Sequence, residues 1–403
     1  MSPKLKKILI IVGFIAVILI LGFIIYFTFF RVPAEQPVII PTEEPPTTGG
    51  LPLAGEATAR PEVKGDAIGV FGERITGGLL SADDLTAISA NNITLSATGN
   101  SVQYYDADSG LFYSVDKNGN TNTLTNKKFY NVKNVTWSGD KNKAVLEYPD
   151  GSNIIYNFKT KQQTTLPKHW EDFNFSPDGE KLISKSISDD VDARWLISSN
   201  VDGTNTKVIT ALGENADKVQ VAWSPNNQVV AFSSTGDPTS SLGTEEIYLL
   251  GQNNENFKSL KVQGFNFQAK WAQEGDRLLY NVTDPGTDFK PVLWITDASG
   301  DNIGTNAVKV NLNTWVDKCT VVSNYRAYCA VPKILDSGAG LEPRAAYESD
   351  DIIYAVNLKT GAVNFIGEPD TDYSISQVSV SEKEDYIFFT DRATGTLHKM
   401  KVQ

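Results

Sequence analysis

The sequence predicts an all-β protein, a seven-bladed β-propeller of residues 66–403, preceded by one transmembrane α-helix. Three observations predict this organisation: an unbroken apolar stretch near the N-terminus, a Pro-rich segment after it, and a strand-turn-strand pattern that recurs through the remainder. A chain of 403 residues could hold two or three average domains, although all-β folds often use about 250 residues as one unit. The repeat therefore decides the domain count.

The apolar stretch, residues 8–30, reads ILIIVGFIAVILILGFIIYFTFF and contains no charge over 23 residues. As an α-helix it would be about 34 Å long, enough to cross a hydrocarbon core of about 30 Å. It is longer than the apolar region of a secretory signal peptide, and it ends in Phe29, Phe30 and Arg31 instead of a small-x-small cleavage site. We expect an uncleaved signal anchor, with a cleaved signal peptide as the alternative.

The charges that flank this stretch predict its orientation. Lys4, Lys6 and Lys7 precede it and only Arg31 follows closely, so the positive-inside rule keeps residues 1–7 as a cytoplasmic tail. The expected location is the cytoplasmic (inner or plasma) membrane, crossed once, with the C-terminal domain outside the cytoplasm.

Residues 31–65 form a linker with prolines at positions 33, 37, 41, 45, 46, 52 and 61. Prolines at this density exclude helix interiors and central strands and favour an extended polyproline II conformation. The linker is therefore expected to act as a semi-rigid stalk between the membrane and the domain.

The repeat consists of an apolar or aromatic residue, a serine (alanine in one copy), a polar turn and a second apolar strand. The seven copies are centred on Ser96, Ser138, Ser176, Ser224, Ala272, Ser323 and Ser381. Their spacings of 42, 38, 48, 48, 51 and 58 residues lie close to the length of one four-stranded propeller blade, about 40 to 50 residues. Each copy is followed by another strand and a Gly/Asn/Asp turn, which predicts four strands per unit. Six or eight blades stay open, because the first and the last two copies are degenerate.

Proline and glycine or asparagine give the turns of this repeat their shape. In SPDG (176–179) and SPNN (224–227), proline fixes φ at the first turn position and Gly or Asn accepts the left-handed position. The aromatic residues before the turns are expected to pack between neighbouring sheets and not to form ligand cages. These residues are Trp137, Phe175, Trp223 and Trp271.

The pattern W-S-P-D-G, followed by an I-A-F-like strand, an I-Y strand and a D-x-x-G turn, resembles the WD40-like repeat of TolB. It is also similar to the N-terminal propellers of prolyl-oligopeptidase-type peptidases. The resemblance covers about 310 residues and is clearest over 135–300. It implies a propeller fold. The separate α/β domain of TolB does not appear in this chain, and TolB is soluble, so the resemblance does not extend to the partners of TolB.

The last unit has recognisable strands near 376–380, 385–390 and 396–402, which leaves a three-stranded blade with an open edge. Propellers usually close their ring by pairing a strand from one terminus with the blade of the other, because exposed edges invite aggregation. We expect segment 67–76, AIGVFGERIT, to supply the missing outer strand.

The two cysteines flank the turn in CTVVSNYRAYC, so Cys319 and Cys329 would face one another across a hairpin centred near Asn324. Outside the cytoplasm a disulfide is the expected state, and two buried reduced thiols are the alternative. No histidine or cysteine spacing typical of a metal site occurs, and we expect no cofactor.

Connections between the second and third strands of each unit lie on one rim of a propeller. They are long in units three to six, over 186–194, 235–246, 283–291 and 334–351. Loops on a rigid scaffold commonly carry binding residues, and the acidity of these loops favours a basic peptide or a divalent cation, although it is also explained by solvation. The candidate binding rim is Asp189, Asp190, Asp192, Asp237, Asp284, Asp288, Asp336, Glu348, Asp350 and Asp351.

Composition and the absence of known motifs argue against several classes of function. The part beyond Arg31 carries a formal charge of −16, which argues against nucleic-acid binding. No G-x-S-x-G elbow, Gly-rich phosphate loop or H-E-x-x-H motif is present, and we expect no enzyme activity. The sequence therefore predicts a membrane-anchored interaction or scaffold module that binds an envelope protein or peptide. The alternative is a propeller enzyme or carbohydrate-binding domain with an acidic central pocket.

Overall fold

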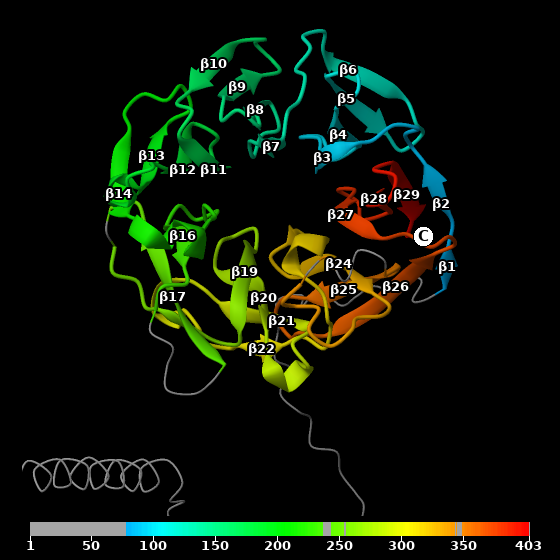
Figure 1. Cartoon of the computed structure of the whole chain (residues 1–403). Coiled ribbons are helices and arrows are strands. Elements are labelled where there is room, and N and C mark those ends of the chain that lie inside the picture. Colours follow the sequence, from blue (N-terminus) through cyan, green and yellow to red (C-terminus); the bar gives the residue numbers. More distant parts are fainter. Residues whose placement is uncertain (1–77, 237–242, 254, 343, 345–348, 403) are drawn as a thin grey trace, which may run out of the picture. The chain divides into compact units, whose positions relative to one another are not determined.

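Seven sheets of mainly antiparallel strands surround a central axis in the computed structural model (Figure 1). It describes residues 78–402 apart from 237–242, 254, 343 and 345–348. The chain adds the strands of each sheet in sequence order, from the innermost to the outermost, except for one outer strand in each of the last two sheets. The predicted seven-bladed propeller is confirmed. The helix expected over 8–30 and the linker over 31–65 lie outside the described residues. No helix within the described part of the chain is long and apolar enough to span a membrane.

Each of the first six blades takes its four main strands from one continuous segment. Blades 1 and 2 consist of β3 (Asn91–Leu95), β4 (Ser101–Asp106), β5 (Leu111–Asp116), β6 (Thr121–Thr125), β7 (Asn134–Trp137), β8 (Lys143–Glu147), β9 (Asn153–Asn157) and β10 (Gln163–Leu166). Blades 3 and 4 consist of β11 (Trp170–Phe175), β12 (Lys181–Ser186), β13 (Trp195–Asn200), β14 (Lys207–Ala211), β15 (Val219–Val221), β16 (Val229–Ser233), β17 (Thr244–Gly251) and β18 (Leu260–Gln263).

The remaining blades follow in the same order. Blades 5 and 6 consist of β19 (Phe265–Trp271), β20 (Arg277–Thr283), β21 (Pro291–Asp297), β22 (Val308–Lys309), β23 (Cys319–Ser323), β24 (Arg326–Pro332), β25 (Asp351–Asn357) and β26 (Val363–Pro369). Blade 7 takes β27 (Ile375–Val380), β28 (Tyr386–Asp391) and β29 (Leu397–Lys401) from the end of the chain. Short 3₁₀-helices lie in the connections: η1 (Val191–Ala193), η2 (Gly213–Lys218), η3 (Pro285–Thr287), η4 (Gly300–Asn302) and η5 (Val316–Lys318).

The ring is closed by strands from the N-terminal side of the domain. β2 (Ala82–Asp84) pairs with β29 and completes blade 7, and β1 (Leu79–Leu80) pairs in parallel with β26 as a fifth strand of blade 6. Figure 1 shows both strands, in blue, at the outer edge beside the orange and red strands. Closure by an N-terminal strand is confirmed, but the choice of segment 67–76 was wrong. That segment lies outside the described residues, and Ala82–Asp84 occupies the position assigned to it.

The repeated serine holds the first turn of a blade together. In blade 3, the hydroxyl of Ser176 donates to Asp178 Oδ1 at 2.5 Å and accepts from the backbone N–H of Lys181 at 2.9 Å. Ser224 in blade 4 makes the same two contacts, to Asn226 and from Val229. The serine thus bonds to both sides of the turn, which explains why it recurs with an Asp or Asn two residues later.

The core lies between adjacent blades. Trp137 stacks on Phe158 of its own blade, contacts Phe112 of blade 1 edge-on, and donates its indole N–H to the carbonyl of Asn92 at 2.9 Å. Trp271 likewise donates across the blade boundary, to the carbonyl of Ala222 at 3.1 Å. These aromatic residues pack between sheets as predicted, and apolar clusters of the same kind join the other blades. The result is a rigid ring that holds the loops of one face in fixed positions.

Candidate functional site

The long connections gather on one face of the propeller. They join β12 to β13, β16 to β17, β20 to β21 and β24 to β25, which are the second and third strands of blades 3 to 6. Because neighbouring strands alternate in direction, the connections from one blade to the next open on the same face, and the serine turns lie on the opposite face. We call the face that carries the long connections the long-loop face.

Two of the long loops are hydrogen-bonded to one another. The backbone N–H groups of Gly338 and Gly340 donate to the carbonyls of Asp288 and Phe289, each at 2.8 Å. A Cβ atom at Gly340 would lie 2.5 Å from the hydroxyl of Thr283, so only glycine allows this approach. The loop of blade 6 is thereby fixed over the end of blade 5.

A pocket of about 920 Å³ opens under these loops. Its walls come from the starts of the inner strands, the ends of the second strands and the connections between blades 3, 4, 5 and 6. Asp172 and Asn266, which line it, adopt left-handed backbone conformations at β-bulges in β11 and β19. Such bulges redirect side chains next to functional sites.

More carboxylates than lysines line the pocket. The set comprises Asp172, Lys185, Asp217, Lys218, Glu245 and Asp317. Lys185 and Asp172 form an ion pair at 2.7 Å, and the side chain of Lys185 is almost completely buried. The other three carboxylates face one further lysine, so the lining carries a net charge of −2.

Glu245 stands out among these groups. Its Oε2 atom is buried and has no hydrogen-bond partner among the described residues. Burial raises the pKa of the Glu245 carboxyl above its ordinary value, and the nearby charge of Lys218 opposes this shift. A desolvated carboxylate without a donor costs free energy, so its position here calls for a functional explanation.

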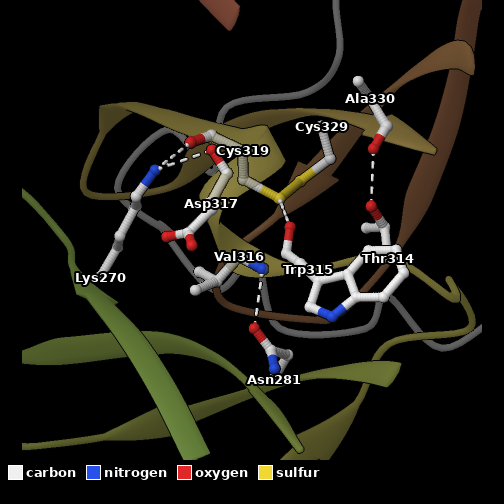
Figure 2. Close-up of a disulfide and its surroundings, with 9 residues drawn as sticks. All are labelled: Lys270, Asn281, Thr314, Trp315, Val316, Asp317, Cys319, Cys329 and Ala330. Carbon is white, nitrogen blue, oxygen red and sulfur yellow. Dashed lines mark hydrogen bonds between the residues drawn. A yellow bond between two sulfur atoms is a disulfide. The ribbon is translucent and has the colours of Figure 1, made fainter. Parts of the chain in front are cut away.

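Two buried residues with N–H donors line the same pocket. Asn281 is 2% exposed, and its Oδ1 accepts from the backbone N–H of Val316 at 2.8 Å, which leaves its amide nitrogen free on the other side (Figure 2). Trp315 is 8% exposed, and its indole N–H has no partner among the described residues. Both residues line the pocket. Their donors are therefore available only to something that enters it.

The segment that carries Trp315 and Asp317 is fixed from several sides (Figure 2). The hydroxyl of Thr314 donates to the carbonyl of Ala330 at 2.7 Å, and Lys270 Nζ donates to the carbonyls of Asp317 at 3.2 Å and Cys319 at 2.8 Å. Burial lowers the pKa of Lys270, and the charge of Asp317 opposes this shift. The carboxylate of Asp317 makes no hydrogen bond among the residues drawn.

A disulfide between Cys319 and Cys329 anchors the end of this segment. The two residues are directly opposite in the register of β23 and β24, with Cα atoms 4.0 Å apart. The sulfur of Cys319 lies 3.8 Å from the carbonyl oxygen of Trp315. A disulfide sulfur carries no proton, so this is a packing contact. It places the cross-link directly beneath the pocket wall.

The acidic residues of the candidate binding rim lie outside this pocket, and the rim stays a separate prediction. None of the candidate rim residues lines the pocket, and Asp237 and Glu348 lie outside the described residues. Asp190 and Asp284 accept backbone N–H groups at the starts of η1 and η3, which is a structural role. Asp189, Asp192, Asp288 and Asp336 are exposed, Asp350 is half-buried, and none of the five lines the pocket.

Asp351 requires a correction, because it is buried and unavailable at the surface. It is 1% exposed and pairs with Lys318 Nζ at 2.6 Å and 2.7 Å, and it also accepts from the backbone N–H of Ile375. Burial raises the pKa of Asp351 and lowers that of Lys318, and their mutual attraction opposes both shifts. The pair lies within blade 6, and the hydrogen bond from Ile375 links Asp351 to the first strand of blade 7.

Two of the residues that line the pocket belong to a sequence pattern that the prediction from the long loops did not use. An Asp-Lys pair directly precedes the inner strand of blade 4, at 217–218, and of blade 6, at 317–318. Both aspartates line the pocket. Both pairs lie in the connections between blades, which the prediction from the loops within blades did not consider.

No family model matches the chain, and no curated protein matches it. Solved structures match in fold. An oligogalacturonate lyase in complex with manganese is 13% identical, with 80% of this chain and 93% of that chain covered and a TM-score of 0.53. The β-propeller domain of Cps50 (Swd1) from Myceliophteria thermophila is 10% identical, with 80% and 100% covered and a TM-score of 0.52. A chain of the mitotic checkpoint complex is 13% identical, with 91% and 99% covered and a TM-score of 0.54. At these identities the likeness shows the propeller fold alone.

Proposed function

We propose that the chain is a membrane-tethered interaction module of the cell envelope, whose propeller lies outside the cytoplasm and binds an envelope protein or peptide on the long-loop face. The observation that carries this proposal is the pocket of about 920 Å³ enclosed by the connections of blades 3 to 6. Loops held by a rigid ring are suited to recognition, because little order is lost when they bind.

Two features support the location outside the cytoplasm. The apolar stretch 8–30 follows three lysines, which is the arrangement of a signal anchor with its N-terminus inside. The disulfide between Cys319 and Cys329 suits an oxidising compartment, because thiols are kept reduced in most cytosols. Together they favour a propeller carried on the linker 31–65 beyond the membrane.

Exposed apolar side chains support the choice of face. Ile334 is 74% exposed and Leu341 is 53% exposed, and both belong to the long loop of blade 6. Leu341 also lines the pocket. Apolar side chains beside polar groups that lack partners are typical of the centre of a recognition surface.

Site-specific photo-cross-linking in intact cells tests the proposal. A benzophenone amino acid replaces Leu341 on the long-loop face, and in a matched variant it replaces Tyr325, which is 52% exposed on a turn of the same blade. Tyr325 lies on the opposite face, between β23 and β24. We expect one discrete envelope-protein adduct from position 341 and none from position 325. No adduct from 341, or the same adducts from both positions, would overturn the proposal.

A second candidate is a propeller enzyme or carbohydrate-binding domain. One observation favours it: four carboxylates line the pocket, and a raised pKa such as that of Glu245 suits a general acid. A glycan array probed with the full-length chain, followed by chromatography of any bound glycan, tests it. Binding or cleavage that Glu245→Gln abolishes would support this candidate over the first.

A further inference from the structure

We propose that the pocket on the long-loop face takes a lysine or arginine side chain from an extended peptide segment, with Glu245 and Asp317 as the main contacts of the cation. This inference rests on the proposed function and specifies the ligand of the same site. It follows from three properties of the pocket wall: its excess charge, a carboxylate without a donor, and two donors without acceptors.

The excess charge calls for a cation. Lys185 Nζ forms an ion pair with Asp172 Oδ2 at 2.7 Å, so these two charges offset one another. Asp217, Glu245 and Asp317 line the pocket together with Lys218, and the charge of Lys270, behind the wall, interacts with that of Asp317. These three carboxylates thus have two lysines near them, and one negative charge stays uncompensated. A cationic group that enters the pocket restores the balance, whereas an anionic ligand would add to the repulsion.

The Glu245 carboxylate calls for a cation that also donates hydrogen bonds. Its Oε2 atom is shielded from solvent and finds no donor among the described residues. Ammonium and guanidinium groups are charged donors, and their hydrogen bonds to carboxylates are the strong ones in proteins. A ligand of this kind would satisfy the group that the fold leaves without a partner.

Asn281 and Trp315 add a requirement that a small cation does not meet. Both are more than nine-tenths buried and line the pocket, and the described residues offer no acceptor to the N–H groups of their side chains. A metal ion or a simple amine offers no acceptor to these groups. A peptide supplies both partners, because its main-chain carbonyls accept from the two donors while its cationic side chain reaches the carboxylates.

The dimensions of the pocket agree with this occupant. A volume of about 920 Å³ exceeds what one side chain fills and lies at the upper end of ligand sites, about 300 to 1,000 Å³. The exposed Leu341 at its edge offers apolar contact to the flanking part of the peptide. The pocket therefore has room for the side chain and the neighbouring backbone.

A fixed-position heptapeptide library, screened against the full-length chain purified in detergent, tests the ligand class. We expect enrichment of sublibraries with Lys or Arg at the central position. The best binder is then resynthesised with acetyl-lysine or citrulline in place of the cation, which keeps the shape and removes the charge. This exchange should weaken binding by about tenfold or more, measured by fluorescence polarisation.

Variants of the protein complete the test. Glu245→Gln and Asp317→Asn should each weaken the best binder by about tenfold, and Glu382→Gln, an exposed residue on the opposite face, should change binding less than about twofold. Failure to enrich a cationic sublibrary, equal binding of the neutral peptide, saccharide binding at the site, or an equal effect of Glu382→Gln would overturn the inference. The cross-link from position 341 would still appear in that case if the proposed function holds.

Discussion

His398 Nδ1 lies 2.9 Å from Asp84 Oδ1, although 314 residues separate them in the chain. Asp84 ends β2 and His398 lies in β29, so this contact joins the strand that closes the ring to the last strand of the domain. The imidazole is 4% exposed and packs against Tyr373 and Phe389. It therefore combines a hydrogen bond across the seam with a place in the core of blade 7.

Truncation of this histidine should destabilise the pairing of β2 with β29 that closes the ring. We expect His398→Ala to lower the free energy of unfolding by about 2 to 4 kcal/mol, because it removes a buried ring and leaves a cavity. Urea unfolding followed by tryptophan fluorescence measures the change. His169→Ala is the matched control, since His169 is exposed, and it should leave the midpoint unchanged. Equal effects of the two substitutions would show that His398 has no special part in closure.

The buried pair of Lys318 and Asp351 should be more sensitive than any surface pair. Asp351→Asn leaves the ammonium of Lys318 buried without a counter-charge, and we expect a loss of about 3 to 5 kcal/mol in unfolding free energy. Lys168→Ala removes the exposed pair with Asp150, in which the side chains are 67% and 63% exposed, and should have no measurable effect. A small effect of Asp351→Asn would mean that water reaches Lys318.

Loss of the disulfide should affect both stability and the pocket. The Cys319→Ser, Cys329→Ser double variant removes a cross-link between residues ten apart, which by the chain-entropy estimate lowers the unfolding free energy by about 2 to 3 kcal/mol. Because Cys319 follows η5, the variant should also weaken any ligand that contacts Asp317. A non-reducing mass map that finds both thiols free in the wild-type chain would contradict the prediction.

Substitution of Glu245 should stabilise the fold while it weakens ligand binding. Burial raises the pKa of Glu245 in the folded protein. Such a carboxyl contributes its full stabilisation at pH values below its unfolded pKa, where it is protonated in both states. This contribution is lost as the pH rises through the folded pKa. At neutral pH the charge of Glu245 therefore lowers the free energy of unfolding, and Glu245→Gln removes this charge.

Thermal melts at two pH values check this prediction. We expect Glu245→Gln to melt at a higher temperature than the wild type at neutral pH and at the same temperature near pH 4, where the carboxyl is largely protonated in both states. Glu382→Gln serves as the control and should melt like the wild type at both pH values. A lower melting temperature for Glu245→Gln at neutral pH would mean that the carboxylate has a partner in solution.

The blades could be predicted from the sequence because their pattern is local. Each unit contains its own aromatic residue, serine turn and alternating strands, so the spacing of Ser138, Ser176 and Ser224 alone reveals the period. The hairpin of Cys319 and Cys329 is local in the same sense, because the turn between them sets their register. The face that carries the long loops follows from strand order for the same reason.

The tertiary structure decided what depends on residues that are far apart in the chain. Which strand closes the ring depends on whether residues near 70 or near 83 reach β29, and the paired residues are Ala82–Asp84. Asp351 resembled a surface carboxylate in the sequence, but it begins β25 and is buried where Lys318 and the backbone N–H of Ile375 both donate to it. The pocket combines Asp172, Glu245, Asn281 and Trp315 from four blades, and only the closure of the ring brings them to one opening. Local patterns specify each sheet, whereas burial and charge at the centre depend on how the sheets meet.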